Sequence, residues 1–332
     1  MPDPTLLTFT VMKNEGPFIL EWVAWQRLMG VDRILVFTND CDDGTDALLD
    51  ELDRQGTVFH LPNPLVASPP GSPMRQSPHL TGINYARRLR PWREADYIFL
   101  TDVDEFPSLR GGDTSLKALL ERLDWPDVLT MAETIFGTGD VIAFEDRPVT
   151  QQFTKSASMA PGKWRSRRGF KSIMRNMPRL GIRNHRPIAK PEVAQSLRWL
   201  DGSGNDFPQE LRPVHQKGAD ARGMYDLVSI NHYTLRALES FMVKQERGDA
   251  VAEDRINETY FRRRNQNFVE NTEMLVHGPR LEEEIESLKN NPRLAELHLA
   301  AVEAHKAKIA RLKKTQLYQD LLAVAGLAPA DG

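Results

Sequence analysis

The beginning of the chain alternates short apolar runs with segments of helical periodicity. Residues 6–12, 33–38 and 57–61 are apolar, β-favouring runs and predict strands. Between them, apolar side chains recur at helical spacing over residues 18–29, and a second helix is predicted over residues 46–55. This β-α-β-α-β order predicts a parallel, right-handed, doubly wound sheet with helices on its faces.

The pattern continues with fewer strands and more helices. Residues 62–78 are rich in proline and serine and predict a loop. The later predicted elements are helices over 79–90, from Ser115 onward and over 235–247, and strands over 97–100, 127–132 and 228–233. Residues 254–325 interleave charged and apolar positions, which predicts amphipathic helices that pack on the sheet or form a dimer.

One predicted strand is followed directly by acids. Residues 97–100 are apolar on both faces, and Asp102, Asp104 and Glu105 come immediately afterwards. Open α/β sheets bind ligands at the carboxyl ends of their strands. In an extended backbone, Asp102 and Asp104 would leave the same face, where two carboxylates repel each other unless a cation neutralises them. This predicts a Mg2+ or Mn2+ site for a phosphorylated substrate.

The alternative is a strand end whose acids cap the next helix or face water. A D-x-D pattern is short and common, so the spacing alone leaves both interpretations open. The buried strand before the acids and Phe106 after them favour the metal site.

Charge and composition narrow the function classes. A net charge of −3 and a pI near 6.3 argue against a general nucleic-acid binder. Cys41 is the sole cysteine, which excludes an intramolecular disulfide and fits a reducing compartment. Neither a leader peptide nor a membrane-spanning run is visible, so we expect a cytoplasmic protein.

A basic stretch, residues 155–186, stands out in this slightly acidic chain. It is either a solvated basic face, a patch for an anionic membrane, or a clamp for a diphosphate. Within it, Lys171 and Arg175 are bracketed by apolar residues and look the most specific. Further on, His232 ends an apolar strand, and we favour a ligand role for it over a structural one.

Together these motifs resemble the nucleotide-sugar-dependent glycosyltransferases of the GT-A fold, close to family 2 and more narrowly to the subgroup related to family 92. The resemblance covers roughly residues 6–250. The matching residues are Lys13-Asn14-Glu15 with Glu21-Trp22, Gly30-Val31-Asp32, Asn39 to Thr45, Thr101 to Phe106, Phe136-Gly137, Lys171 to Arg175, His185, and Asn231-His232-Tyr233 with Lys244 and Arg247-Gly248.

The resemblance implies roles for individual residues. Asp102 and Asp104 match the motif that binds the metal ion and the diphosphate, and His232 matches a late histidine that completes the metal shell or touches the diphosphate. The residues that match the nucleoside-binding region are Val11, Lys13, Asn14, Glu15, Asn39 and Asp43. Family 2 enzymes carry an aspartate where this chain has Asn39, which leaves the identity of the base open. Lys171, Arg175 and His185 match a basic block, in which Lys171 or Arg175 would assist at the diphosphate and His185 has no fixed role.

The implied fold is an α/β GT-A architecture, with a mostly parallel sheet, flanking helices and a helical C-terminal tail. Residues 1–150 would form the nucleotide-sugar-binding half of one domain, residues 151–250 its acceptor- and diphosphate-binding half, and residues 251–332 a helical extension.

The implied reaction moves a sugar from a nucleoside diphosphate sugar, expected to be a UDP-sugar, to a hydroxyl of a glycan or lipid-linked acceptor, as in polysaccharide biosynthesis. If the reaction inverts the anomeric centre, it needs a carboxylate base. Glu133, at the end of a predicted strand, is the first candidate and Glu105 the second. Further expectations are peripheral membrane contact and a homo-oligomer formed by the C-terminal helices.

Three rival functions stay open. Another metal-dependent nucleotidyl or phosphoryl transferase would use the same acids, although no P-loop pattern is visible. A sugar- or nucleotide-binding protein without turnover is the second rival. A scaffold that assembles through the C-terminal helices is the third.

Overall fold

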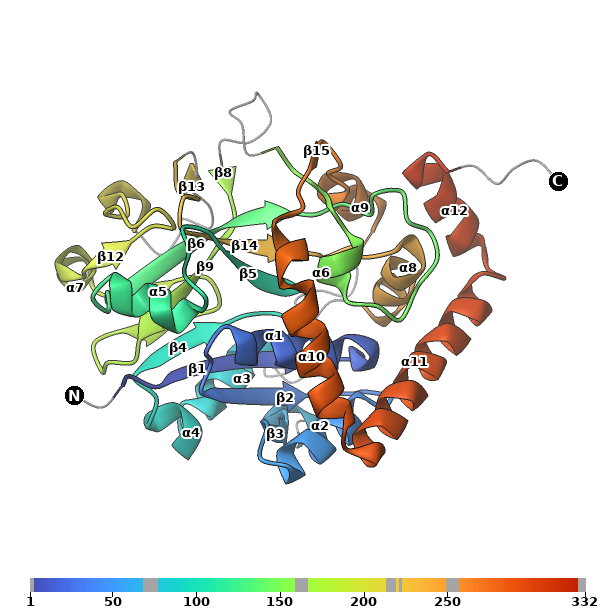
Figure 1. Ribbon diagram of the computed structural model, residues 1–332, viewed down its shortest axis with the longest axis horizontal. Coiled ribbons are helices and arrows are strands. Elements are labelled where there is room, and N and C mark those ends of the chain that lie inside the picture. The colour runs from blue at the N-terminus through green and yellow to red at the C-terminus, as the bar shows by residue number, and fades with distance from the viewer. Residues whose placement is uncertain are drawn as a thin grey trace.

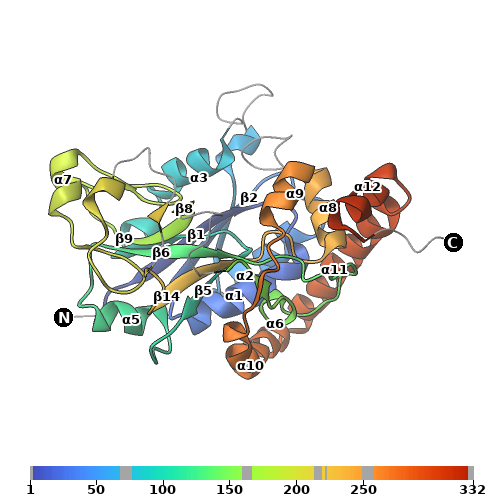
Figure 2. The same ribbon diagram turned by 90° about the horizontal axis from the view of Figure 1, so that it is seen from above.

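The computed structural model describes residues 3–67, 77–158, 167–212, 219–220, 223–248 and 257–327. Within these ranges the chain forms a central mixed sheet between two layers of helices, with further helices beyond one end of the sheet (Figures 1 and 2). The predicted α/β class is therefore confirmed.

The central sheet combines strands from both halves of the chain. Its order is β3 (Phe59–Pro62), β2 (Arg33–Thr38), β1 (Leu6–Met12), β4 (Tyr97–Leu100), β9 (Phe170–Arg175), β6 (Val128–Ile135), β14 (Val228–His232) and β5 (Glu105–Leu109), with β12 (Trp199–Leu200) also paired to β6. In this sheet β9 and β5 run antiparallel to their neighbours and the other strands are mutually parallel. The predicted mostly parallel sheet is confirmed, while β9 and β5 were not predicted.

Helices cover both faces of this sheet. One face carries η1 (Gly16–Phe18), α1 (Ile19–Leu28), α2 (Thr45–Arg54), α5 (Leu116–Arg122) and α10 (Gly278–Lys289); the other carries α3 (Pro78–Ala86), α4 (Arg90–Arg93) and α7 (Pro191–Ser196) (Figure 2). Trp22 and Trp25 of α1 are fully buried against the first face. The helix predicted over 79–90 is two helices, and the strand predicted from residue 57 begins at Phe59.

Short elements complete the described chain. Three two-residue ladders pair β7 (Lys155–Ser156) with β15 (Val269–Glu270), β8 (Arg167–Arg168) with β13 (Ala219–Asp220), and β10 (Gly181–Ile182) with β11 (Pro187–Ile188). The remaining short helices are α6 (Val149–Gln152), η2 (Pro64–Ala67), η4 (Gln209–Leu211) and η6 (Glu273–His277).

The helices after β14 form a third apolar cluster beside the sheet. They are α8 (Leu238–Arg247), α9 (Glu258–Arg264), α11 (Pro292–Leu312) and α12 (Gln316–Ala325) (Figure 1). Helix α11 packs on η1 so closely that a Cβ on Gly16 would lie 2.6 Å from Cβ of Ala301. The predicted amphipathic helices are thus confirmed, and α11 packs against the sheet half of the molecule.

Several predicted segments reach residues outside the described ranges, including residues 254–256 at the start of the predicted C-terminal helices. The proline-rich loop includes residues 68–76, and the basic stretch includes residues 159–166, so neither can be compared in full. Within the described ranges, we find no helix with the length and apolar character that crossing a bilayer requires.

Candidate active site

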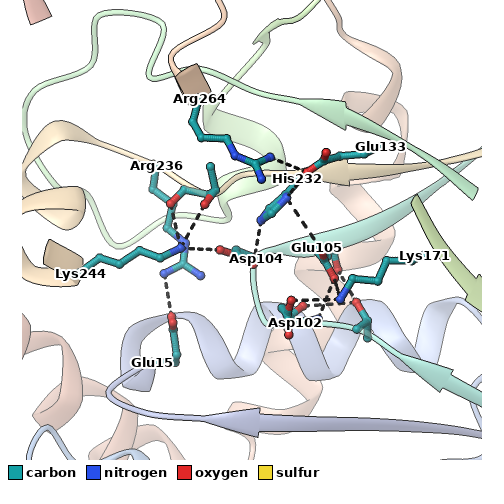
Figure 3. Close-up of polar contacts among 12 residues, drawn as sticks. Glu15, Asp102, Asp104, Glu105, Glu133, Lys171, His232, Arg236, Lys244 and Arg264 are labelled. Atoms are coloured by element: carbon teal, nitrogen blue, oxygen red, sulfur yellow. Dashed lines mark hydrogen bonds and ion pairs between the residues drawn. The ribbon is translucent and has the colours of Figure 1, made fainter. Parts of the chain in front are cut away.

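The acids that follow β4 lie in a tight turn at the carboxyl end of this strand, on the side of the sheet where the parallel strands end. Glu105 donates its backbone N–H to the carbonyl of Asp102 at 3.1 Å, and the Glu105 carboxylate accepts the N–H of Asp102 at 2.9 Å. Because the backbone turns here, Asp102 and Asp104 do not leave one face of an extended strand, and that prediction is wrong. Their side chains instead bind two different cations (Figure 3).

Lys171 holds the first pair of carboxylates. It is the second residue of β9, which begins at this edge, and its side chain is buried. Its Nζ lies 3.0 Å from Asp102 and 2.8 Å from Glu105, and donates to Asn184 at 2.9 Å. Burial alone would raise the pKa of Asp102, but the Lys171 ammonium and His79 lower it to about 2. Lys171 was predicted from the sequence, and the structure places it beside Asp102.

Lys244 and His232 hold Asp104 from the other side. Nζ of Lys244, in the last turn of α8, lies 2.7 Å from Oδ2 of Asp104, and Nε2 of His232 lies 3.4 Å from Oδ1. Although burial opposes ionisation, both cations hold the pKa of Asp104 well below its usual range. The sequence had placed His232 beside the acids, and the structure brings it there at the end of β14.

Glu133 and Arg264 fix the other side of the His232 ring. Nδ1 of His232 is 2.5 Å from Oε1 of Glu133, and Nη1 of Arg264 is 2.6 Å from the same oxygen. Burial favours a neutral ring, yet Asp104 and Glu133 raise the pKa of His232 to about 10. Both nitrogens of His232 therefore face carboxylates.

These contacts change the expected role of Glu133. Burial would raise its pKa, but Arg264 and His232 hold the pKa of Glu133 far below its usual range. A carboxylate paired with two cations is a weak proton acceptor, because an effective general base has a pKa near the working pH. The assignment of Glu133 as the base thus conflicts with its electrostatic environment. Glu105, the second candidate, is buried against Lys171 and supports the turn.

The predicted nucleoside region consists of a turn and a loop joined by hydrogen bonds. The backbone N–H of Asp42 donates to Oδ1 of Asn14 at 2.9 Å, and the N–H of Gly16 donates to Oδ2 of Asp43 at 3.1 Å. Glu15 donates its N–H to Thr45 at 2.9 Å. The turn after β1 and the loop after β2 therefore form one unit.

Two arginines bind this unit to the helices that follow β14. Glu15 accepts Nη1 of Arg236 at 2.8 Å and also pairs with Arg247. Arg247 donates to the carbonyls of Lys13 and Asn14, the latter at 2.7 Å. The motif comparison included Arg247 and Lys244 without a role, whereas Arg236 and Arg264 were missed. Their partners are distant in sequence, so no local pattern indicates them.

Two residues predicted to bind the nucleoside, Val11 and Asn39, form no hydrogen bond or ion pair, within the described ranges, with the acids that follow β4 or with the cations that bind those acids. Val11 is buried in the core, where its side chain lies next to the position that a Cβ on Gly82 would occupy. Asn39 is buried and donates to Asp40 at 3.3 Å.

Arg175 does not belong to the site, and its prediction is wrong. It pairs with Tyr97 at the start of β4, about 10 Å or more from the strand end that leads to Asp102. Its guanidinium binds Asp127 at 3.0 Å and lies over the Tyr97 ring. Lys171 and Arg175 are at opposite ends of the same strand.

Comparison with known proteins gives a family. Residues 12–199 match glycosyltransferase family 92. A glycosyltransferase family 92 protein of Ricinus communis is 29% identical over 161 residues, which are 45% of this chain and 26% of that protein. The match thus spans about a quarter of the length of this curated relative.

Similar solved structures are distant. A Staphylococcus aureus TarS structure of residues 1–349 is 11% identical with a TM-score of 0.31, and covers 97% of this chain and 87% of that one. A second TarS structure is 12% identical with a TM-score of 0.30, covering 97% and 53%. The bifunctional IspDF of Campylobacter jejuni is 11% identical with a TM-score of 0.24, covering 59% and 55%.

Proposed function

Because the chain belongs to glycosyltransferase family 92, we propose that it transfers a sugar from a nucleoside diphosphate sugar to an acceptor hydroxyl. The observation that carries this proposal is the position of Asp104 between Lys244 and His232, at the edge of the sheet next to the turn after β1. Several charged side chains of both signs therefore lie beside the turn after β1 and the loop after β2, which we expect to bind the nucleoside. The GT-A resemblance of the sequence and the inverting stereochemistry belong to the same proposal.

The donor would lie across the turn and loop that Asn14 and Asp43 join. The polar groups of this unit offer donors and acceptors to a base and a ribose, and UDP is the nucleotide we expect. Its diphosphate would then reach Arg247, Lys244 and Lys171, whose cations stabilise the charge that develops as the anomeric bond breaks. In this arrangement the side chains that form ion pairs with acids in the free protein would form ion pairs with the diphosphate instead.

Asp104 and His232 would offer two ligands to a divalent cation. No group of three His, Cys, Asp or Glu side chains in the described ranges is arranged to hold a metal ion. However, Oδ1 of Asp104 and Nε2 of His232 are 3.4 Å apart, and Glu133 binds the other ring nitrogen, as outer partners of metal-binding histidines do. Mn2+ or Mg2+ would be held by Asp104 and by His232 once Nε2 had released its proton, with Asp102 nearby, and phosphate oxygens and water would complete its shell. Such an ion would neutralise charge on the departing diphosphate.

A glycan or lipid-linked acceptor is part of the proposal, as are a cytoplasmic location with peripheral membrane contact and self-association through the C-terminal helices. The basic stretch that would meet an anionic lipid surface is described only in part. Binding to vesicles of phosphatidylglycerol and phosphatidylcholine should weaken steeply with salt. Salt-insensitive or absent binding would remove the membrane contact.

Calorimetric titration with UDP tests the core of the proposal. We expect binding that requires Mn2+, exceeds that of GDP and is lost in Asp104→Ala. Asp50→Ala is the matched control, because the Asp50 side chain is 72% exposed on α2. Absence of nucleotide binding under every metal condition would favour the scaffold. Tight UDP binding without release of UDP from UDP sugars, across many acceptors, would favour a binding protein.

A further inference from the structure

His185 is held against the active-site end of β9. It lies in the segment between β10 and β11, and its Nδ1 is 3.0 Å from the carbonyl oxygen of Phe170. Its own carbonyl accepts the Ser172 hydroxyl at 2.9 Å, while the adjacent Asn184 accepts Nζ of Lys171 at 2.9 Å. Both the backbone and the ring of His185 are therefore fixed relative to Lys171.

The contact with Phe170 determines which ring nitrogen carries hydrogen. A carbonyl oxygen only accepts, so Nδ1 must be the donor, and the neutral ring then presents a lone pair at Nε2. No hydrogen bond joins Nε2 to another of the described residues, and His185 is exposed to solvent. Nε2 is thus a potential proton acceptor on a residue that is exposed to solvent.

The charges around His185 keep its ring neutral. Partial desolvation of the ring, followed by the nearby Lys171 ammonium, lowers the pKa of His185 to about 4. Asp102 and Glu133 oppose the shift from a greater distance. At neutral pH the free protein therefore carries His185 as a neutral ring with no proton on Nε2.

The two carboxylates considered as bases, Glu133 and Glu105, are held in ion pairs and are not free to accept a proton. Glu133 is paired with His232 and Arg264, and Glu105 is buried against Lys171. Each would have to give up a buried ion pair to take a proton. Nε2 of His185, in contrast, has no ion pair or hydrogen bond with another of the described residues.

The order of the strands places His185 on the acceptor side. The nucleoside unit follows β1 and β2, the acids follow β4, and His185 contacts the first residue of β9, the next strand along. A donor that spans from the nucleoside unit to the acids would present its sugar toward β9. An acceptor hydroxyl that attacks the anomeric carbon from beyond the sugar would then meet His185.

We propose that His185 is the general base that removes the proton of the acceptor hydroxyl, an inference that rests on the proposed function. The acceptor oxygen forms a bond to the anomeric carbon while its proton passes to Nε2. The bond between the anomeric carbon and the diphosphate oxygen breaks, and its electron pair leaves with the nucleoside diphosphate. The resulting imidazolium then releases the proton to solvent.

Donor binding would strengthen this base. The negative charges of a diphosphate beside Lys171 offset the ammonium that disfavours protonation of His185. Its pKa should therefore rise from about 4 when UDP and Mg2+ bind. A base whose pKa moves toward the working pH in the complex suits general base catalysis.

Two measurements on the full chain test the proposal. The first is release of UDP from UDP-glucose, UDP-galactose and UDP-N-acetylglucosamine, with water as the acceptor. His185→Ala should slow release by about 100-fold or more, keep the Kd for UDP within about twofold, and regain activity with added imidazole. His277→Ala, a histidine that packs on Trp25, is the control and should change neither quantity. Unchanged release in His185→Ala, or loss of UDP affinity together with rate, would overturn the proposal.

The second measurement is NMR of the 15N-labelled histidine rings, which separates failure of the base from failure of the proposed function. We expect His185 to be neutral at pH 7 with hydrogen on Nδ1, and its pKa to rise on addition of UDP and Mg2+. A charged ring, hydrogen on Nε2, or a pKa unaffected by bound UDP would overturn the role of His185. A protein that binds no UDP would overturn the proposed function, and the base with it.

Discussion

Nδ1 of His232 lies 2.5 Å from Oε1 of Glu133, and this contact orients the imidazole while Asp104 and Glu133 together raise its pKa. Arg264 binds the same carboxylate oxygen from α9. A glutamate that the sequence suggested as a base therefore acts, in the structure, as the partner that positions His232.

Glu133→Gln should weaken the metal-dependent affinity for UDP by about 10- to 100-fold, because a neutral amide forms a weaker hydrogen bond to Nδ1 and no longer fixes the orientation of the His232 ring. Calorimetry with and without Mn2+ measures this. Glu145→Gln, at an exposed ion pair with Arg147, should leave affinity unchanged. A Glu133→Gln variant with full UDP affinity but a large fall in turnover would return the base role to Glu133.

Lys171→Met should lower the free energy of unfolding by about 3–5 kcal/mol, because it leaves Asp102 and Glu105 without their buried cation. Adding Glu105→Gln should recover part of the loss, since it removes one unpaired charge. Urea unfolding measures both variants, and Lys190→Met at an exposed position serves as the control. If the double variant is less stable than Lys171→Met alone, the unpaired charge is not the cause.

Glu21 gives stability a pH dependence. Burial raises the pKa of this carboxyl from 4.5 to about 7, against the opposing hydrogen bonds from Val149 and Thr150. The folded protein then binds a proton that the unfolded chain has released, so stability falls as pH rises from about 4.5 to about 7 and is level above that range.

Measured against Glu21→Gln, the wild type should lose up to roughly 3 kcal/mol of unfolding free energy across this interval. The difference between the two proteins isolates Glu21, because every other titrating group is shared. Urea unfolding at a series of pH values supplies it. A constant or rising difference across the interval would contradict a raised pKa.

Gly16→Ala should destabilise the protein by about 1–3 kcal/mol, since its new Cβ would overlap Cβ of Ala301. Ala301→Gly alone should cost about 1 kcal/mol as a glycine within a helix. Combined, the two changes should cost less than their sum, because the second makes room for the first. The affinity for UDP should fall most in the variants that lose most unfolding free energy. An additive double-mutant cycle would mean that α11 and the turn after β1 do not press on each other.

The periodic part of the fold was predictable from local pattern, and β9 and β5 were not. The sequence of Phe170–Arg175 contains two cations, Lys171 and Arg175, and was interpreted as a basic block. A buried strand with a lysine in it forms here only because Asp102 and Glu105 neutralise the Lys171 ammonium. Pro107 made Glu105–Leu109 an unlikely strand by its sequence, but β5 lies at the edge of the sheet, where proline is tolerated. In both cases the deciding contacts come from distant parts of the chain.

The candidate site was predictable in its location and only partly in its geometry. A strand followed by acids indicated the edge of the sheet, and His232 and Lys171 were placed there correctly. The alternation rule failed for Asp102 and Asp104 because β4 ends at Leu100. The prediction for Arg175 failed because Lys171 and Arg175 lie near opposite ends of the same six-residue strand, so only Lys171 is close to the acids.

The contact between Gly16 and Ala301 also determines at which stage of its synthesis the protein becomes able to bind UDP. The turn after β1 leaves the ribosome early, whereas α11, which packs against it, is translated near the end. Since chains fold from their N-terminal part as they emerge, the sheet has time to form while the nucleoside unit still lacks its outer support. We therefore expect nascent chains halted before α11 to hold a folded sheet that retains UDP poorly, and affinity to arise only once the last helices have docked.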